Sequence, residues 1–358
     1  YTPYQPEVSQ GILQALFEYQ SLLAELLEID VVNASMYDWA TALGEAFRMA
    51  ARVTKRKKIL YPHYISPQRM EVASTYSSGM ELRLEDYMQL EDGSVDVEDL
   101  QNKLDRDVAA IYIEYPSYLG FISKNIKVIG ELAHELGALF IVGVDPSALG
   151  IFEAPGRLGA DIVVGEGQPL GLPMSFGGPL LGILGCRLEP KLLHSLPGRL
   201  IGMTKTIKGD ERAYCMILQS REQHIKREKA TSNICTNQAL CAVAVAAYLS
   251  LLGKNGFIEL GRQILARTNY MIKKLSEISG INAPLFDAPH FKEFTYKVDG
   301  YSSHELLRRL LERGIVGGID LGREFDELNN SILTCVTEIH SKQDIDQYVN
   351  AVKEVVER

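Results

Sequence analysis

Two patterns of apolar residues alternate along the first two-thirds of the chain. Short continuous apolar runs, such as 139–144 (Leu-Phe-Ile-Val-Gly-Val), are typical of strands buried on both faces of a sheet. Between them, apolar residues recur every three to four positions, which is typical of amphipathic helices. The expected strands are 30–34, 58–60, 109–113, 138–144, 161–164 and 180–184, and the expected helices are 7–28, 41–51, 67–76, 97–104 and 126–136.

This alternation predicts an α/β fold with a large, doubly wound, mostly parallel sheet. Beyond about residue 253 the pattern changes to helices 257–278, 304–313 and 343–356 with strands 294–298 and 331–336 between them. We therefore predict two domains. Residues 1–253 form a large α/β domain that begins with an arm and a helix over 1–29, and residues 254–358 form a small C-terminal α+β domain.

The predicted parallel sheet also indicates where a ligand would bind. In parallel sheets, ligands gather at the carboxyl ends of the strands. This rule places 35–39, 115–120, 145–147 and 165–171 around one crevice. Glu114, just before the second segment, is a candidate general acid or base, although nothing in the sequence indicates a perturbed environment.

The segments around this crevice look like the cofactor region of a pyridoxal-phosphate enzyme that has lost its amine. Such enzymes pair a strand-end Asp with the pyridine nitrogen and form a Schiff base with a Lys some twenty to thirty residues later. Asp145 ends an apolar strand here, but Gln168 stands at the position of the lysine. An amide nitrogen is not nucleophilic, so Gln168 cannot form the imine. Asp145 also has a structural interpretation, as the cap of the turn at Pro146.

Composition and charge exclude several other functions. The 358 residues are 46% apolar and carry a net charge of −9, which argues against nucleic acid as a partner. No run of eighteen or more apolar residues indicates a membrane span. The five cysteines are odd in number and without CxxC spacing, and the seven histidines form no HExxH pair, so we expect free thiols, a cytoplasmic location and no metal.

Four stretches resemble the P-protein of the glycine cleavage system, and in particular its alpha subunit, called subunit 1. They are YTPYQPEVSQG at 1–11, NASMYD at 33–38, LPMSFGGP at 172–179 and LQSREQHIKREKATSNICT at 218–236. The resemblance extends to CVTE at 335–338. It implies a pyridoxal-phosphate-dependent transferase of fold type I, which is aspartate-aminotransferase-like.

The resemblance also implies an activity and its partners. The family decarboxylates glycine by means of pyridoxal phosphate and transfers the aminomethyl group to the lipoyl arm of the H-protein. The alpha chain is implied to lack the Schiff-base lysine and to act with a homologous beta subunit, subunit 2, which binds the cofactor covalently. The implied assembly is a heterotetramer of two alpha and two beta chains.

The candidate site residues follow from the resemblance together with residue chemistry. We expect Thr231, Ser232 and Asn233 to reach the phosphate of the partner's cofactor across the subunit interface, with helix capping as the alternative. Trp39 departs from the family pattern, which has Gly there, and its indole would obstruct a phosphate pocket. The candidates for a substrate channel or subunit interface are Tyr1, Thr2, Tyr4, Gln5, Ser35 and Tyr115, and a terminal arm packed on the surface is the alternative for the first four.

Two other functions remain open at this point. The chain is alternatively a self-sufficient pyridoxal-dependent aminotransferase or desulfurase whose lysine lies elsewhere, at Lys205, Lys208 or Lys229. It is alternatively a non-catalytic scaffold that only stabilises a partner subunit.

Overall fold

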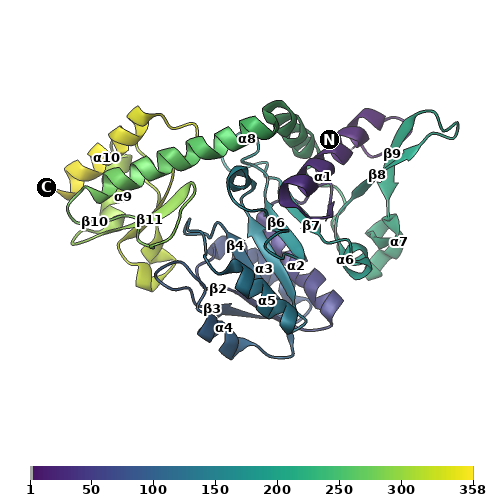
Figure 1. The fold of residues 1–358 in the computed structure, drawn as a ribbon, viewed down its shortest axis with the longest axis horizontal. Helices are drawn as coiled ribbons and strands as arrows, with labels where there is room; N and C mark the ends of the chain where they lie inside the picture. Colours follow the sequence, from purple (N-terminus) through teal and green to yellow (C-terminus); the bar gives the residue numbers. More distant parts are fainter. Residues whose placement is uncertain (1–2, 358) are drawn as a thin grey trace.

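A seven-stranded sheet forms the centre of the computed structural model, which describes residues 3–357 (Figure 1). Its strand order is β1-β7-β6-β5-β4-β2-β3. The five strands from β6 to β3 are parallel to their neighbours, whereas β7 is antiparallel to both β6 and β1. The predicted mostly parallel sheet is thereby confirmed. The strands are β1 (Val31–Val32), β2 (Lys58–Pro62), β3 (Arg83–Tyr87), β4 (Val108–Tyr115), β5 (Leu139–Val144), β6 (Ile162–Glu166) and β7 (Gly182–Cys186).

Helices cover both faces of this sheet. Along β4, Ile111 and Ile113 pack in one buried cluster with α1, α5 and the start of α8, while Ala110 and Tyr112 pack in another with α2, α3 and α6. This alternation explains why all eight residues of β4 are buried. The helices are α1 (Gln10–Leu27), α2 (Trp39–Thr54), α3 (Pro67–Ser78), α4 (Val97–Lys103), α5 (Ile126–Glu135), α6 (Pro190–Ser195) and α7 (Gln223–Lys226).

The sequence pattern missed one strand of the large sheet and one separate hairpin. Strand β3 is an edge strand that carries Arg83, Glu85 and Asp86, so it has no continuous apolar run. The hairpin of β8 (Leu200–Lys205) and β9 (Arg212–Ile217) projects from the body of the molecule (Figure 1).

A second, antiparallel sheet in the order β10-β11-β13-β12 packs against α9, α10 and the second half of α8. Its elements are β10 (Ile281–Asn282), β11 (Glu293–Val298), β12 (Ile319–Asp320), β13 (Ser331–Cys335), α9 (Ser303–Leu311) and α10 (Lys342–Val356). Helix α8 (Ala239–Ser276) runs from one sheet to the other and has a non-helical residue, Gly253, at φ 58°. That residue is where we place the boundary between the two predicted domains, and the division itself stays a prediction.

The two sheets meet through a third set of contacts. A buried aromatic and aliphatic cluster joins Tyr64 and Phe121, which follow β2 and β4, to Phe286 and Phe325 near the small sheet. At Gly120 (φ 90°), a Cβ would stand 2.0 Å from the carbonyl oxygen of Glu293. Only glycine therefore allows the loop after β4 to approach β11 this closely.

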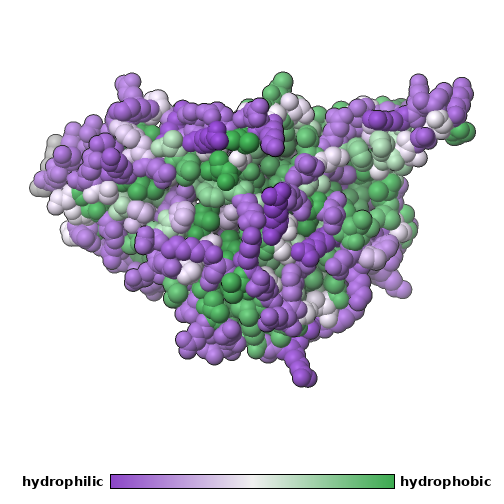
Figure 2. Space-filling model, viewed as in Figure 1, coloured by the Kyte–Doolittle hydropathy of each residue, from purple (hydrophilic) through white to green (hydrophobic). Residues whose placement is uncertain are grey.

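The first half of α8 leaves an apolar stripe exposed. Leu240, Ala244, Ala247 and Leu251 lie on the same side of the helix at helical spacing, and all four are exposed. By length and composition α8 alone qualifies as a membrane-spanning candidate within residues 3–357, and 28% of its most apolar window is buried. Figure 2 shows hydrophobic surface near the middle of the upper edge, where the first half of α8 lies in Figure 1.

Candidate functional site

The carboxyl ends of the central strands enclose a cavity of about 230 Å³. The sequence predicted that 35–39, 115–120, 145–147 and 165–171 surround one crevice, and all four segments contribute to the wall of this cavity. The first residue of α2, the loop after β4, the residue after β5 and the loop after β6 are joined there by α3 and by the start of β11. The cavity wall includes Trp39, Arg69, Glu114, Ser117, Tyr118, Asp145, Glu166, Gln168, Lys292 and Glu293.

Gln168 lies in this cavity wall with its side chain turned back onto its own loop. Its amide Nε2 donates to the carbonyl oxygen of Leu172 at 2.7 Å, and its backbone N–H donates to Glu166 at 3.0 Å. Glu166 also accepts backbone N–H groups from Leu181 and Trp39. Burial raises the pKa of Glu166 despite these three hydrogen bonds. Gln168 therefore stabilises the loop conformation rather than reaching into the cavity.

Trp39 occupies the start of α2, which is capped by Asp38 and Thr41. Its indole N–H donates to the hydroxyl of Tyr112 at 3.1 Å, and the guanidinium carbon of Arg69 lies 3.8 Å from the ring centroid. Such a cation–π contact fixes both side chains. Gly143 of β5 makes room for them, because a Cβ there would meet the Tyr112 hydroxyl at 2.2 Å and the indole at 2.8 Å.

Arg69 also forms an ion pair with Glu114, whose side chain is only 1% exposed. The hydroxyl of Tyr112 donates to the same carboxylate oxygen, Oε1, at 3.0 Å. Burial lowers the pKa of Arg69, but the charge and hydrogen bond of Glu114, together with smaller contributions from Tyr112 and Tyr118, outweigh burial. The net shift is upward, and Arg69 stays protonated. The predicted acid–base candidate Glu114 is therefore held as a paired carboxylate.

Asp145 pairs with a lysine that the sequence analysis did not single out. The ammonium Nζ of Lys292 lies 2.5 Å from Asp145 Oδ2, and both side chains are nearly buried. Burial alone would lower the pKa of Lys292, but the charges of Asp145 and Glu293 raise it above its ordinary value. Lys292 thus remains an ammonium, which is not nucleophilic. The other carboxylate oxygen of Asp145 accepts from Ser147, as in the predicted turn cap.

Pyridoxal phosphate does not fit this arrangement. The aspartate that would meet a pyridinium nitrogen is already paired with Lys292, and the indole of Trp39 with Arg69 occupies the helix start that would receive the phosphate. No side chain on the β6 loop offers an amine, because Gln168 is an amide. The described residues of this cavity therefore offer neither the amine for a covalent bond nor the free carboxylate for an ionic contact that pyridoxal phosphate requires.

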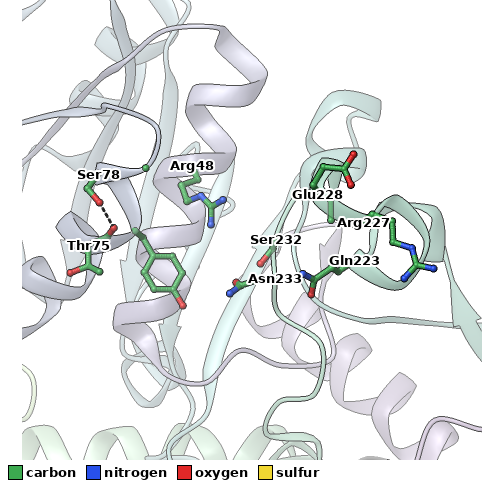
Figure 3. A pocket seen from close by; sticks show the side chains of 11 residues that line it. Arg48, Thr75, Ser78, Gln223, Arg227, Glu228, Ser232 and Asn233 are labelled. Atoms are coloured by element: carbon green, nitrogen blue, oxygen red, sulfur yellow. Dashed lines mark hydrogen bonds between the residues drawn. The ribbon is translucent and has the colours of Figure 1, made fainter.

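Ser232 and Asn233 line a different recess, of about 530 Å³, on the surface beside α2 and α3. Figure 3 shows Arg48 of α2 on one side of this recess and Ser232 and Asn233 on the other. The Ser232 hydroxyl donates to Glu45 at 2.5 Å, while Asn233 is exposed. Since Arg48 follows Trp39 by nine residues, the recess lies roughly 13 Å along α2 from the strand-end cavity. These residues therefore do not serve this chain's own cavity.

Thr231 is hydrogen-bonded to the backbone of Arg221, through both its N–H and its hydroxyl, at 3.4 and 3.5 Å. Helix α8 begins at Ala239, so residues 231–233 do not cap it directly. Their expected contact with a partner's cofactor stays a prediction.

Tyr4 and Ser35, two of the expected interface residues, meet inside the chain. Both hydroxyls donate to the side-chain oxygen of Asn237, that of Tyr4 at 3.2 Å. Tyr4 and Ser35 are buried, whereas Gln5 is exposed. Tyr1 and Thr2 lie outside the described residues. An interface or channel role for this group stays a prediction.

Tyr115 ends β4, and its ring packs edge-on against Phe152 at 6.2 Å between centroids. Burial raises the pKa of its hydroxyl to about 12. The following residues, Ser117 and Tyr118, reach the cavity. Tyr115 therefore supports the wall from behind.

The three alternative lysines are absent from the cavity wall. Lys205 ends β8, Lys208 lies in the turn of the same hairpin, and Lys229 ends a short 3₁₀ turn, and all three are exposed. Exposed lysines on the hairpin lack the buried surroundings that activate a catalytic amine. The cavity lysine is instead Lys292.

Sequence reasoning missed Arg69, Lys292 and Asn237. Lys292 is separated from Asp145 by more than a hundred residues and directly precedes a strand of the other sheet, so no local pattern links them. Two adjacent charged residues, Lys292 and Glu293, before the expected strand 294–298 were the only signal available.

The fold and the cavity place the chain in a class. Its architecture is that of the pyridoxal-phosphate-dependent enzymes of fold type I, for example a cysteine desulfurase from Thermococcus onnurineus, with a TM-score of 0.66 at 17% identity over 97% of this chain and 85% of that one. The crystal structure of a glycine decarboxylase (P-protein) of the glycine cleavage system, in inhibitor-bound form, is far more similar. It has a TM-score of 0.92 and 38% identity over 99% of this chain and 78% of that chain.

The family follows from the sequence comparisons. The family profile described as glycine cleavage system P-protein matches residues 1–352, and the chain belongs to this family. A probable glycine dehydrogenase (decarboxylating) subunit 1 of Staphylothermus marinus is 52% identical over 99% of this chain and 76% of its own length. The protein of the same description from Aeropyrum pernix is 49% identical over 99% of this chain and 77% of its own length.

Proposed function

We propose that this chain is the lysine-free subunit of a glycine decarboxylase. In this proposal a homologous, lysine-bearing subunit holds pyridoxal phosphate covalently, and two chains of each kind form the complex. The complex decarboxylates glycine and transfers the aminomethyl group to the lipoyl arm of the H-protein. The isolated chain is inactive.

The observation that carries this proposal is the Asp145–Lys292 ion pair beside Gln168. Among the described residues 3–357, the one lysine in the cavity wall is held as an ammonium by the same aspartate that a bound cofactor would need. Covalent chemistry must then be supplied by another chain. The description of the relatives as subunit 1 supports the existence of a second kind of subunit.

The exposed stripe on α8 supports an extensive contact with that partner. Leu240 is 56% and Leu251 88% exposed, with the small residues Ala244 and Ala247 between them. Exposed apolar surface of this kind marks an interaction site. Because Lys254 and further charged residues follow Gly253 on the same helix, we favour a protein chain over a membrane as the covering surface.

The recess next to α2 supports a contribution to the partner's site. Arg48, Arg227 and the exposed amide of Asn233 line it, and this combination of donors suits a phosphate. In the proposed complex Thr231, Ser232 and Asn233 contact the phosphate of the partner's cofactor. Ser232 has its hydroxyl directed to Glu45, so Asn233 and Arg48 contribute most to that contact.

Borohydride reduction in the presence of pyridoxal phosphate tests which of the two chains binds the cofactor covalently. We expect no stoichiometric adduct on this chain when it is treated alone. In the assembled complex we expect one adduct, located by peptide mass spectrometry on the partner chain. An adduct at a single lysine of this chain, such as Lys205, Lys208 or Lys229, would favour the self-sufficient enzyme instead.

If this chain were only a scaffold, without any role in the partner's site, a different result would be expected. Substitution of Asn233 or Thr231 by Ala would then leave glycine decarboxylation by the complex unchanged. We expect the Asn233→Ala complex to assemble normally and to release pyridoxal phosphate more readily on dialysis. Ser276→Ala, at the exposed end of α8, is the matched control.

A further inference from the structure

The strand-end cavity contains buried acceptors that its own ion pairs leave unused. Within the described residues, Oε2 of Glu114 and Oγ of Ser117 have no hydrogen-bond partner. Both residues line the cavity, and both are at least 94% buried, with exposed fractions of 2% and 6%. A buried polar group left unpaired is destabilising, and more so if it is charged. Two such groups on one cavity wall therefore indicate a ligand that donates hydrogen bonds to them.

A metal ion is not the ligand that this arrangement suits. In residues 3–357 no group of three His, Cys, Asp or Glu side chains is placed to hold one. An organic ammonium needs fewer convergent charges, since it donates three hydrogen bonds in different directions. Glu114 and Ser117 supply two acceptors for it, one of them charged.

The cavity also presents cations for an anionic group. Arg69 uses one guanidinium nitrogen on Glu114, and Lys292 places its ammonium on Asp145. A guanidinium carries five N–H donors and an ammonium three, so donors remain on both for a carboxylate. Residues with unused acceptors and residues with unused donors thus line the same cavity.

We propose that this cavity binds a free α-amino acid without covalent chemistry. Its ammonium donates to Glu114 and Ser117, and its carboxylate accepts from Arg69 and Lys292. The volume of about 230 Å³ lies below the usual range for drug-sized ligands, so a small amino acid such as glycine fits best. This site goes beyond the proposed function, because it belongs to this chain and not to the partner's cofactor site.

Trp39 provides a direct measurement of binding. It is the only tryptophan of the chain, and its indole lines the cavity. Titration of the chain with glycine is followed by tryptophan fluorescence and by the single indole N–H resonance. We expect a saturable change in both signals. Glycolate lacks the ammonium and methylamine lacks the carboxylate, so each is expected to bind at least about tenfold more weakly than glycine.

Two variants test whether glycine binds through the acceptor groups of Glu114 and Ser117. Ser117→Ala removes one acceptor without disturbing an ion pair, and Glu114→Gln removes the charge but keeps the shape. Each is expected to weaken glycine binding severalfold or more. The matched controls are Ser276→Ala at the end of α8 and Glu312→Gln directly after α9. Both change exposed positions and are expected to bind glycine as the unaltered chain does.

The proposal is overturned if glycine produces no saturable change, or if Ser117→Ala binds glycine as tightly as the unaltered chain. Should Glu114→Gln fail to fold, Ser117→Ala alone decides the question. These titrations use no pyridoxal phosphate and no partner subunit. Their failure would therefore leave the proposed role in glycine decarboxylation untouched, and the failure of that role would leave this site untouched.

Discussion

Lys292 Nζ lies 2.5 Å from Asp145 Oδ2, and this ion pair joins the residue before β11 of the small sheet to the residue after β5 of the large one. Its two side chains are 13% and 9% exposed, so water contributes little to their solvation. An isolated charge at this depth would be costly, and each residue therefore depends on the other. The pair couples the packing of the two sheets to the chemistry of the cavity.

Lys292→Met is expected to lower the free energy of unfolding by about 3–5 kcal/mol, because it leaves Asp145 buried without a cation. Chemical denaturation followed by circular dichroism measures this change. Lys254→Met, on the exposed surface of α8, is the control and should change stability little. The double variant Lys292→Met with Asp145→Leu should recover part of the loss, and a double variant less stable than the single one would contradict the coupling.

Gln168→Lys alone is expected to produce no glycine decarboxylation. Trp39 with Arg69 still occupies the start of α2, and Asp145 remains paired with Lys292, so the cofactor has no place to bind. The measurement is release of carbon dioxide from labelled glycine with pyridoxal phosphate and lipoylated H-protein. Gln263→Lys, exposed on α8, shows the background of non-specific lysine adducts. Turnover by the Gln168→Lys chain without a partner would show that pyridoxal phosphate does fit the strand-end cavity, and would contradict this expectation.

The contacts of His63 predict that the free energy of unfolding depends on pH. It lies between the sheets, with Nδ1 at 2.6 Å from Asp86 and Nε2 at 2.8 Å from Glu327, and the rings of Tyr64 and Phe325 pack beside it. Burial alone would lower the pKa of His63, but the two carboxylates raise it above the ordinary value of 6.5. The stabilisation is therefore complete below pH 6.5 and is lost as the pH rises through the folded-state pKa.

Measurement of the unfolding free energy on both sides of that pKa checks this expectation. His63→Gln should remove most of the decline between pH 6.5 and pH values above the folded-state pKa. His194→Gln, an exposed position on α6, serves as the control and should retain the decline. A decline of equal size in the His63→Gln chain would assign the pH dependence to other groups.

Leu251→Asp is expected to prevent assembly with the partner subunit while leaving the isolated chain folded. Leu251 is 88% exposed, so its replacement removes little buried apolar area from the chain itself. In a buried interface the same carboxylate would be desolvated without a partner, which is strongly unfavourable. Light scattering after mixing with the lysine-bearing subunit measures the assembly.

Leu311→Asp on α9 is the matched control, since Leu311 is also exposed at 62% but lies away from the α8 stripe. Its complex should form normally. A Leu251→Asp chain that assembles as well as the control would place the interface elsewhere.

Much of the fold is visible in the sequence because it depends on local patterns. The run 139–144 became β5 (Leu139–Val144), and the helical spacing over 67–76 became α3 (Pro67–Ser78), with Pro67 at its first turn and Ser66 as its cap. Strand β3 was missed, because an edge strand with one exposed face carries charged residues that hide its period.

The sequence by itself determined that this chain has a doubly wound sheet, an aspartate at the end of β5, and an amide, Gln168, where a reactive amine would be needed. These follow from residue identity and from the periods of strands and helices, which are local properties. Only the tertiary structure decided that Lys292 neutralises Asp145, that Arg69 covers Trp39, and that Ser232 and Asn233 face a separate recess. Such contacts join residues far apart in the chain, and no local period encodes which distant charge will complete a buried pair.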